Sequence, residues 1–130
     1  MADTTIVTEF LNKYYQTFST LNVESIAPFF HEPCLFVSPQ GVIAAPTHDV
    51  LKEVFKTIAK DLLSKGYGRS ELTQLNVERM SATAMLATGV AVRFTADGSE
   101  LERVGLTYIL QKSGSGWRIA VTVIHDAVLT

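Results

Sequence analysis

The sequence predicts an α+β domain in which three N-terminal helices pack against a cone-shaped, curved antiparallel sheet that is mixed at its edge. Two observations indicate this class. Apolar residues recur at helical spacing in three segments that end by Leu62, whereas from Leu72 onward the chain alternates in long strand-like runs separated by turn signals. The 130 residues contain no repeat, low-complexity tract or linker, so we expect a single domain spanning residues 1–130.

The first two helices are expected before Pro33. The first has Thr4 or Thr5 as its N-cap. Its apolar face consists of Val7, Phe10, Leu11, Tyr14 and Phe18. Asn22 caps a short second helix, whose Ile26, Phe29 and Phe30 share one face. This helix should end just before Pro33, because the residue before a proline is disfavoured in helical geometry.

The third helix is expected to begin after the cap Thr47 and to end at Gly66, a residue type that commonly terminates helices. Its buried stripe consists of Leu51, Val54, Phe55, Ile58 and Leu62. Between the second and third helices, two short strands, 34–37 and 42–45, flank the turn 38–41. Pro39 suits the second position of that turn and Gly41 the last.

Four long strands follow, over residues 72–80, 83–95, 101–112 and 117–126. Asp97-Gly98 is the strongest short hairpin signal and joins the second and third of them. Two or three short helices cannot cover the concave side of such a sheet completely. The expected result is a cavity between sheet and helices, where ligands commonly bind.

Composition excludes several classes of partner. The net charge of −2 gives no basic surface for nucleic acid. No apolar run approaches the length of a membrane span, and the N-terminus does not look like a signal peptide, so a cytoplasmic location without membrane contact is expected. Cys34 is the single cysteine, which excludes an internal disulfide, and its apolar neighbours favour a buried thiol over a nucleophile.

The order of these elements resembles the nuclear transport factor 2-like superfamily, which includes the ketosteroid isomerases and the SnoaL-like polyketide cyclases. Four stretches, LNKYYQTFSTLNVESIAPFF, FVSPQG, TIAKDLL and GWRIAV, carry the resemblance, which runs from about Ile6 to Asp126. It implies the cystatin-like, or NTF2-like, roll. A hot-dog fold is the competing fold, although the two separate helices before the first strand disfavour it.

The resemblance to ketosteroid isomerases implies roles for three positions. Tyr14 matches the tyrosine that donates a hydrogen bond to the substrate oxygen. Ser38 stands where the isomerases have their general base, an aspartate, and Thr107 stands where they have a protonated aspartate. A serine hydroxyl does not accept a carbon-bound proton at neutral pH, so the standard isomerase reaction is not expected.

A hydroxyl-lined, uncharged pocket is therefore the specific expectation, with Tyr14, Ser38 and Thr107 among its polar groups. By period-two alternation His125 shares a strand face with Trp117, Ile119, Val121 and Val123, and that face should look into the cavity. His125 and Tyr14 are the candidate catalytic residues, and the alternative for each is a structural role in the core. The remaining expected lining consists of Phe18, Phe30, Phe36, Phe55, Ile58, Val90, Val92, Phe94, Ile109 and Val123.

The convex outer face of the sheet is expected to carry Arg93 together with Ala87, Gly89, Ala91 and Tyr108. A face that is rich in small residues and not fully polar favours pairing with another subunit, and members of the resembling superfamily often dimerise through it. A homodimer is therefore the expected assembly. Arg103 is either a solvated residue at a strand end or a contact for an acidic group at the rim of the cone.

Two functional hypotheses follow. In the first, the domain binds or transforms an apolar small molecule that has a carbonyl or hydroxyl group. A transformation would make it a SnoaL-like enzyme that acts through His125 or by shape-directed cyclisation. In the second, it is a non-catalytic, dimeric association module whose cone is filled by side chains. A cavity that reaches Tyr14 and His125 and exceeds about 100 Å³ would favour the first. The spacing of His31, Glu32, His48 and Asp49 fits no metal site, so neither a metal nor a cofactor is expected.

Overall fold

The computed structural model describes residues 3–114 and 116–127. Its helices are α1 (Asp3–Phe18), α2 (Val23–Ile26), which continues into the 3₁₀ turn η1 (Ala27–Phe29), and α3 (His48–Ser64). Its strands are β1 (Phe30–Ser38), β2 (Gly41–Ala45), β3 (Tyr67–Arg79), β4 (Ala84–Thr95), β5 (Glu100–Ser113) and β6 (Gly116–His125). These elements confirm the predicted α+β class.

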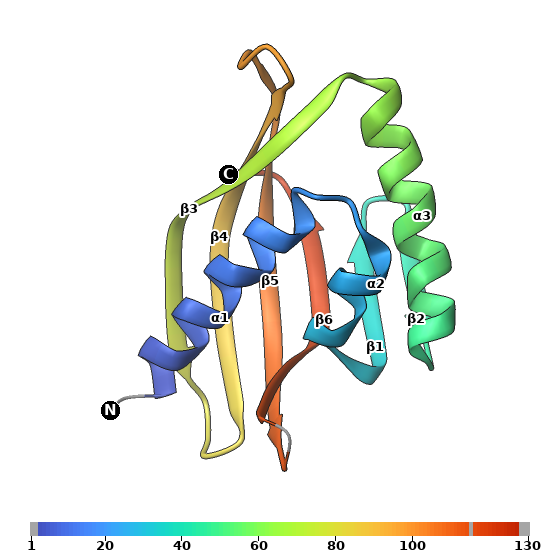
Figure 1. Ribbon diagram of the computed structural model, residues 1–130. Coiled ribbons are helices and arrows are strands. Elements are labelled where there is room, and N and C mark those ends of the chain that lie inside the picture. Colours follow the sequence, from blue (N-terminus) through green and yellow to red (C-terminus); the bar gives the residue numbers. More distant parts are fainter. Residues whose placement is uncertain (1–2, 115, 128–130) are drawn as a thin grey trace.

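The six strands form one sheet in the order β2-β1-β6-β5-β4-β3. All neighbouring strands are antiparallel except β1 and β6, which run parallel, so the sheet is mixed as predicted. The helices lie over one face of the sheet, with α1 in front of β3 to β5 and α3 beside β1 and β2 (Figure 1). We term the face that the helices cover the inner face and the opposite one the outer face.

The predicted caps of α2 and α3 are confirmed, and that of α1 is wrong. The Asn22 side chain accepts hydrogen bonds from two backbone N–H groups at the start of α2, and Thr47 Oγ1 accepts one from Val50 N at 3.3 Å. Thr4 and Thr5 lie inside α1, which already begins at Asp3. The carbonyl of Thr4 accepts a hydrogen bond from the Thr8 hydroxyl at 2.7 Å.

Two predicted boundaries also differ from the structure. Phe30 begins β1 instead of ending a helix, and Pro33 lies inside this strand after a cis peptide bond. Pro33 is tolerated there because the pairing of β1 with β6 is irregular between Phe30 and Leu35, where a missing N–H costs no regular ladder bond. The strand expected from Leu72 begins at Tyr67, because the polar residues before Leu72 are held by pairing with β4 and show no apolar pattern.

The two faces of β4 and β5 are the reverse of the prediction. Tyr108 faces inward, since its hydroxyl lies 2.5 Å from that of Tyr15 on α1. Ala87 is opposite Tyr108, so β4 turns its small residues toward the helices. This makes room for the aromatic side chains of α1. The residues that share this inner face with Ala87 are Gly89, Ala91 and Arg93, and those on the outer face are Val90, Val92, Phe94, Thr107 and Ile109.

A bulge at Ala120 reverses the alternation within β6. Ile119 is opposite Leu110 and Val121 is opposite Ile109, so Ala120 is left without a partner residue on β5. Trp117 and Ile119 are buried, whereas beyond the bulge Thr122 and Ile124 face inward. The prediction that Val121, Val123 and His125 share the face of Trp117 is therefore wrong.

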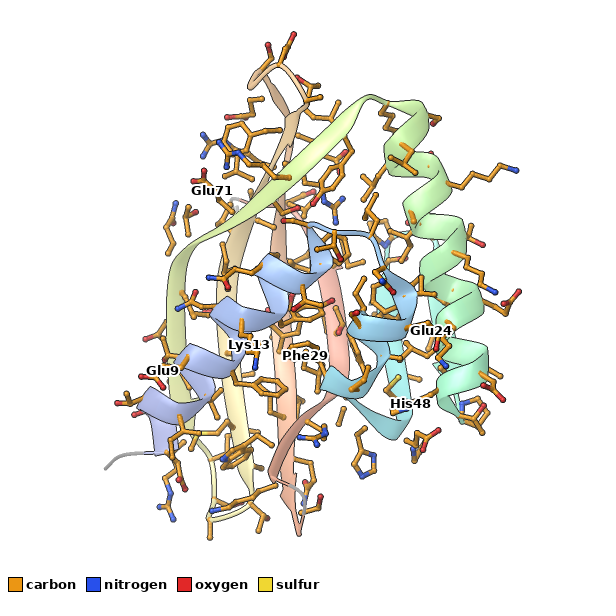
Figure 2. All side chains as sticks on the ribbon, viewed as in Figure 1. Glu9, Lys13, Glu24, Phe29, His48 and Glu71 are labelled. Carbon is orange, nitrogen blue, oxygen red and sulfur yellow. The ribbon has the colours of Figure 1, made fainter. Side chains whose placement is uncertain are left out.

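The core lies between the helices and the inner face, and aromatic rings form its centre. Phe29 packs between α1 and α2, with its ring centroid 5.2 Å from that of Phe10 and 5.5 Å from that of Tyr14 (Figure 2). Cys34 is buried, as predicted, in the same core. Within residues 3–114 and 116–127, no helix has both the length and the apolar character needed to cross a membrane.

Candidate functional site

An open cleft of about 530 Å³ lies between α3 and the strands β1, β2 and β6. Its wall is largely apolar, and its polar residues are Ser38, Gln40, Glu53 and Thr57. The apolar residues of the wall are Phe36, Ile43, Val50, Val54, Ile58 and Ile124. Ile43 and Val50 are both more than a third exposed, so the cleft presents apolar surface to any molecule that enters it.

A smaller inner cavity of about 40 Å³ adjoins this cleft, because Phe36, Ile58 and Ile124 line both. The cavity lies under α1, and residues from six elements enclose it. Besides the three shared residues, they are Tyr14, Tyr15, Phe18, Phe55, Arg93, Leu106, Tyr108 and Thr122. The cavity and the cleft together form the candidate site, with a polar inner end and an apolar outer part.

Two buried polar atoms at the inner end have no hydrogen-bond partner among the described residues. They are Nε of Arg93 and Oγ1 of Thr122. Arg93 forms an ion pair through Nη1 with Glu102, its register partner on β5, and its guanidinium carbon lies 5.8 Å from the centre of the Phe18 ring. Buried polar groups are nearly always paired in folded proteins, so two unpaired ones in a single cavity point to a binding role.

Three tyrosines supply the other polar groups of the cavity. The hydroxyls of Tyr15 and Tyr108 bond each other, while that of Tyr14 makes no hydrogen bond with another described residue. Burial raises the pKa of all three well above the ordinary value of a phenol. They therefore stay neutral at physiological pH. The cavity offers hydroxyl and guanidinium hydrogens as donors, and the guanidinium of Arg93 also pairs with the carboxylate of Glu102.

The structure brings together the predicted lining residues that come from the helices and from β1. Tyr14, Phe18, Phe36, Phe55 and Ile58 all line the inner cavity. Ser38 lies at the cleft, where its hydroxyl donates to Gln40 Oε1 at 3.1 Å and accepts from Gln40 N at 3.2 Å. Phe30 packs against Phe36 and Phe55 behind the cavity wall. Ser38 is thus both the corner of a tight turn and part of the cleft.

The predicted lining residues on β4, β5 and β6 lie on the outer face instead, so the prediction that they line the cavity is wrong. They are Val90, Val92, Phe94, Thr107, Ile109, Val123 and His125. His125 Nε2 lies 2.9 Å from Thr107 Oγ1 on that face, and its ring packs over Gly105, where a Cβ would meet it at 2.4 Å. His125 and Tyr14 are therefore on opposite faces of the sheet and do not form an acid–base pair.

Sequence reasoning missed six residues of the inner cavity, namely Tyr15, Arg93, Leu106, Tyr108, Thr122 and Ile124. One signal for Arg93 was present in the sequence. The Asp97-Gly98 hairpin places Arg93 near Glu102, and oppositely charged residues on facing strands often share a face. Nothing in the sequence indicated the bulge that turns Thr122 and Ile124 inward.

His31, Glu32 and His48 gather at the N-terminal end of α3, where Figure 2 labels His48. The Glu32 carboxylate accepts a hydrogen bond from His48 N at 2.6 Å, and His48 Nε2 lies 2.8 Å from the Phe30 carbonyl oxygen. These bonds tie α3 to β1. Among the described residues, no three or more His, Cys, Asp or Glu side chains gather in a way that could hold a metal ion.

Comparison with known proteins shows where this architecture occurs. Residues 3–127 match the family described as "NTF2-like protein (DUF6841)". No protein of curated function is similar in sequence to the chain.

Solved structures share the fold at low sequence identity. An NTF2-like protein of unknown function from Shewanella oneidensis MR-1 superposes with a TM-score of 0.78 at 14% identity, covering 96% of this chain and 100% of that one. An NTF2-like protein with a cystatin-like fold from Novosphingobium aromaticivorans gives 0.77 at 12% identity, with 95% and 81% covered. A candidate dehydratase of the NTF2-like family from Streptomyces avermitilis gives 0.75 at 13% identity, with 98% and 97% covered. These similarities show the fold.

Proposed function

The chain belongs to the NTF2-like family DUF6841, and we propose that it binds an apolar small molecule in the cleft, with the polar end of that molecule in the inner cavity. One observation carries the proposal. The unpartnered Thr122 Oγ1 and Arg93 Nε lie at the inner end of an otherwise apolar site. A buried donor that the protein leaves unpaired costs on the order of 1–3 kcal/mol, and a ligand that pairs with it recovers this cost.

The dimensions of the site support this proposal. Ligand pockets usually measure about 300–1,000 Å³, a range that the cleft reaches at about 530 Å³. The inner cavity alone, at about 40 Å³, is below the expected minimum of about 100 Å³, and it touches Tyr14 but not His125. The ligand's bulk therefore belongs in the cleft, and only a small group fits inside.

Binding without chemistry is the function that the polar groups favour. General acid–base catalysis near neutral pH needs a group that titrates there. The tyrosines of the cavity have raised pKa values. The carboxylate of Glu102 pairs with Arg93, and that of Glu53, which lines the cleft, pairs with Lys56. We therefore propose a carrier or sensor of an apolar molecule, and we assign no reaction to His125, which lies on the outer face.

A fluorescence titration with Prodan, a neutral naphthyl ketone whose emission shifts to the blue in apolar surroundings, tests the proposal. We expect saturable binding with a blue shift. Ile58 lines both the cavity and the cleft, so Ile58→Trp should abolish it. Leu63→Trp is the matched control, because Leu63 also lies on α3 but is 62% exposed and lines neither. Absence of binding, or binding that Ile58→Trp leaves unchanged, would favour the association module with a filled cone.

We also propose that a second copy of the chain pairs with the outer face. Its centre is apolar, with Val92 nearly buried and Ile109 partly exposed. Four charged residues on this face pair within the chain, Arg69 with Glu71 and Arg103 with Glu100. Two like faces of this kind meet with little net charge between them, which suits the self-complementary contact of a twofold dimer.

A further inference from the structure

We infer that the ligand bound in the cleft carries a neutral carbonyl group at its inner end, and that Arg93 and Thr122 select this group over both a hydrocarbon and an ionised acid. The inference rests on the proposed function, and it adds the chemical class of the ligand and the residues that determine it.

The unpaired groups of the inner cavity call for an acceptor. Nε of Arg93 carries a hydrogen and has no lone pair to offer, so it only donates. The hydroxyls of Thr122 and Tyr14 each have a hydrogen to give and no acceptor among the described residues. A carbonyl oxygen has two lone pairs and can receive two of these three donors. A ligand end that only donates would leave Arg93 unpaired.

The charge balance of the cavity favours a neutral acceptor over a carboxylate. Arg93 is the one cationic side chain among the described residues of the lining, and Glu102 already pairs with it. The exposed fractions of these two side chains are 15% and 30%, so solvent screens the pair only in part. A ligand carboxylate would place a second anion beside Glu102 without a second cation. Like charges in a poorly solvated site disfavour each other's ionised form.

The volume of the cavity limits which part of the ligand enters. About 40 Å³ holds a carbonyl group and excludes an aromatic or alicyclic ring. The ring system must then lie in the cleft against Ile43, Val54 and Ile124. The ligand class that fits is an apolar body with a terminal ketone, aldehyde or ester. A water molecule bound to the same donors is the competing occupant, and it would give no preference between ligands.

Three naphthalenes of nearly the same shape test the inference, with isothermal titration calorimetry at pH 7. They are 2-acetylnaphthalene, the alkene 2-isopropenylnaphthalene, which has CH₂ in place of the oxygen, and 2-naphthoate, which is ionised. We expect the ketone to bind at least about tenfold more tightly than either of the others, since one unpaired buried donor changes affinity by about that factor. Equal affinities for the ketone and the alkene, or tightest binding of naphthoate, would overturn the inference.

Variants of Thr122 and Arg93 test whether these two residues cause the preference for the ketone over the alkene. Thr122→Val removes the hydroxyl at nearly constant shape and should reduce the ratio of ketone to alkene affinity about threefold or more. Thr88→Val is the matched control, because Thr88 lies on the outer face, and it should leave the ratio unchanged. Arg93→Lys keeps the charge and removes Nε–H, so it should reduce the ratio further. Ratios that neither site variant changes would overturn the assignment.

The results separate this inference from the proposed function. If all three probes bind with equal affinity and Ile58→Trp blocks them, the cleft is a binding site and the carbonyl selectivity is wrong. If none of the three binds, the proposed function and the inference are both wrong.

Discussion

Removing one hydroxyl of the Tyr15–Tyr108 pair should lower the free energy of unfolding measurably, and removing both should restore it. Tyr15→Phe leaves the hydroxyl of Tyr108, a residue only 1% exposed, without its partner at 2.5 Å. Leaving one buried hydroxyl unpaired costs about 1–3 kcal/mol. At about 2.1 cal/mol/K of unfolding entropy per residue, a chain of 130 residues loses about 4 °C of Tm per kcal/mol. The expected fall in Tm is therefore about 4–11 °C.

The double variant Tyr15→Phe/Tyr108→Phe isolates the pair. Removing both hydroxyls leaves no unpaired group, so its free energy of unfolding should lie close to that of the native chain and above that of either single variant. Urea unfolding followed by circular dichroism measures all four proteins. Tyr14→Phe is the control, because the Tyr14 hydroxyl has no partner among the described residues and its loss should not destabilise. If the losses of the two single variants simply add in the double variant, the two hydroxyls do not depend on each other and the expectation fails.

Three further outcomes are expected. Thr122→Val should raise the free energy of unfolding by about 1–2 kcal/mol, because it removes an unpaired buried hydroxyl. Thermal unfolding should then show a higher Tm. An unchanged Tm would mean that the hydroxyl has a hydrogen-bond partner. The contribution of the three buried tyrosines to stability should be constant up to about pH 10 and then fall as pH rises. Above that pH the unfolded chain releases phenolic protons that the folded chain keeps. In urea unfolding, each tyrosine with a raised pKa should lower the free energy of unfolding by up to about 1.4 kcal/mol per pH unit. A free energy of unfolding that rose above pH 10 would contradict the burial of these groups. Ile109→Glu should convert a dimer to a monomer in light scattering after size exclusion, and a native chain that is itself monomeric would remove the outer face as an interface.

The parts of the fold that could be predicted from the sequence are those set by a few neighbouring residues, such as helix caps and turns. Asn22 and Thr47 do the capping that their residue types and positions indicate, and the turn around Gly98 joins β4 and β5 as its Asp-Gly pair predicts. These signals depend on a few adjacent residues. The start of β3 at Tyr67 depends on pairing with β4, a strand more than twenty residues away, and its polar residues give no apolar pattern.

The candidate site could be predicted only on its helical side. The period of 3.6 residues assigns Tyr14, Phe55 and Ile58 to buried stripes without ambiguity. On β4 the larger apolar residues alternate with alanines and a glycine, and size alone suggested that Val90 and its neighbours face the core. The helices instead pack on the small residues, and the side chain of Tyr15 on α1 reaches Tyr108 on β5 over that face.

The position of His125 shows a second limit of sequence reasoning. One extra residue at Ala120 exchanges the two faces of β6, and a bulge of this kind depends on how β5 and β6 pair, not on the residues of β6 alone. Strict period-two alternation along β6 therefore placed His125 in the cavity and Thr122 outside it, which is the reverse of the structure.

A crystal structure of the protein soaked with 6-bromo-2-acetylnaphthalene would show whether the cleft and the inner cavity bind an apolar ketone. The anomalous signal of bromine locates the ring independently of its surroundings. We expect a bromine peak in the cleft beside Ile43 and Val54, and the ketone oxygen within hydrogen-bond distance of Thr122 Oγ1 and Arg93 Nε. A ring bound only on the outer face, or no bromine peak in the cleft at a concentration that saturates binding in solution, would contradict the account.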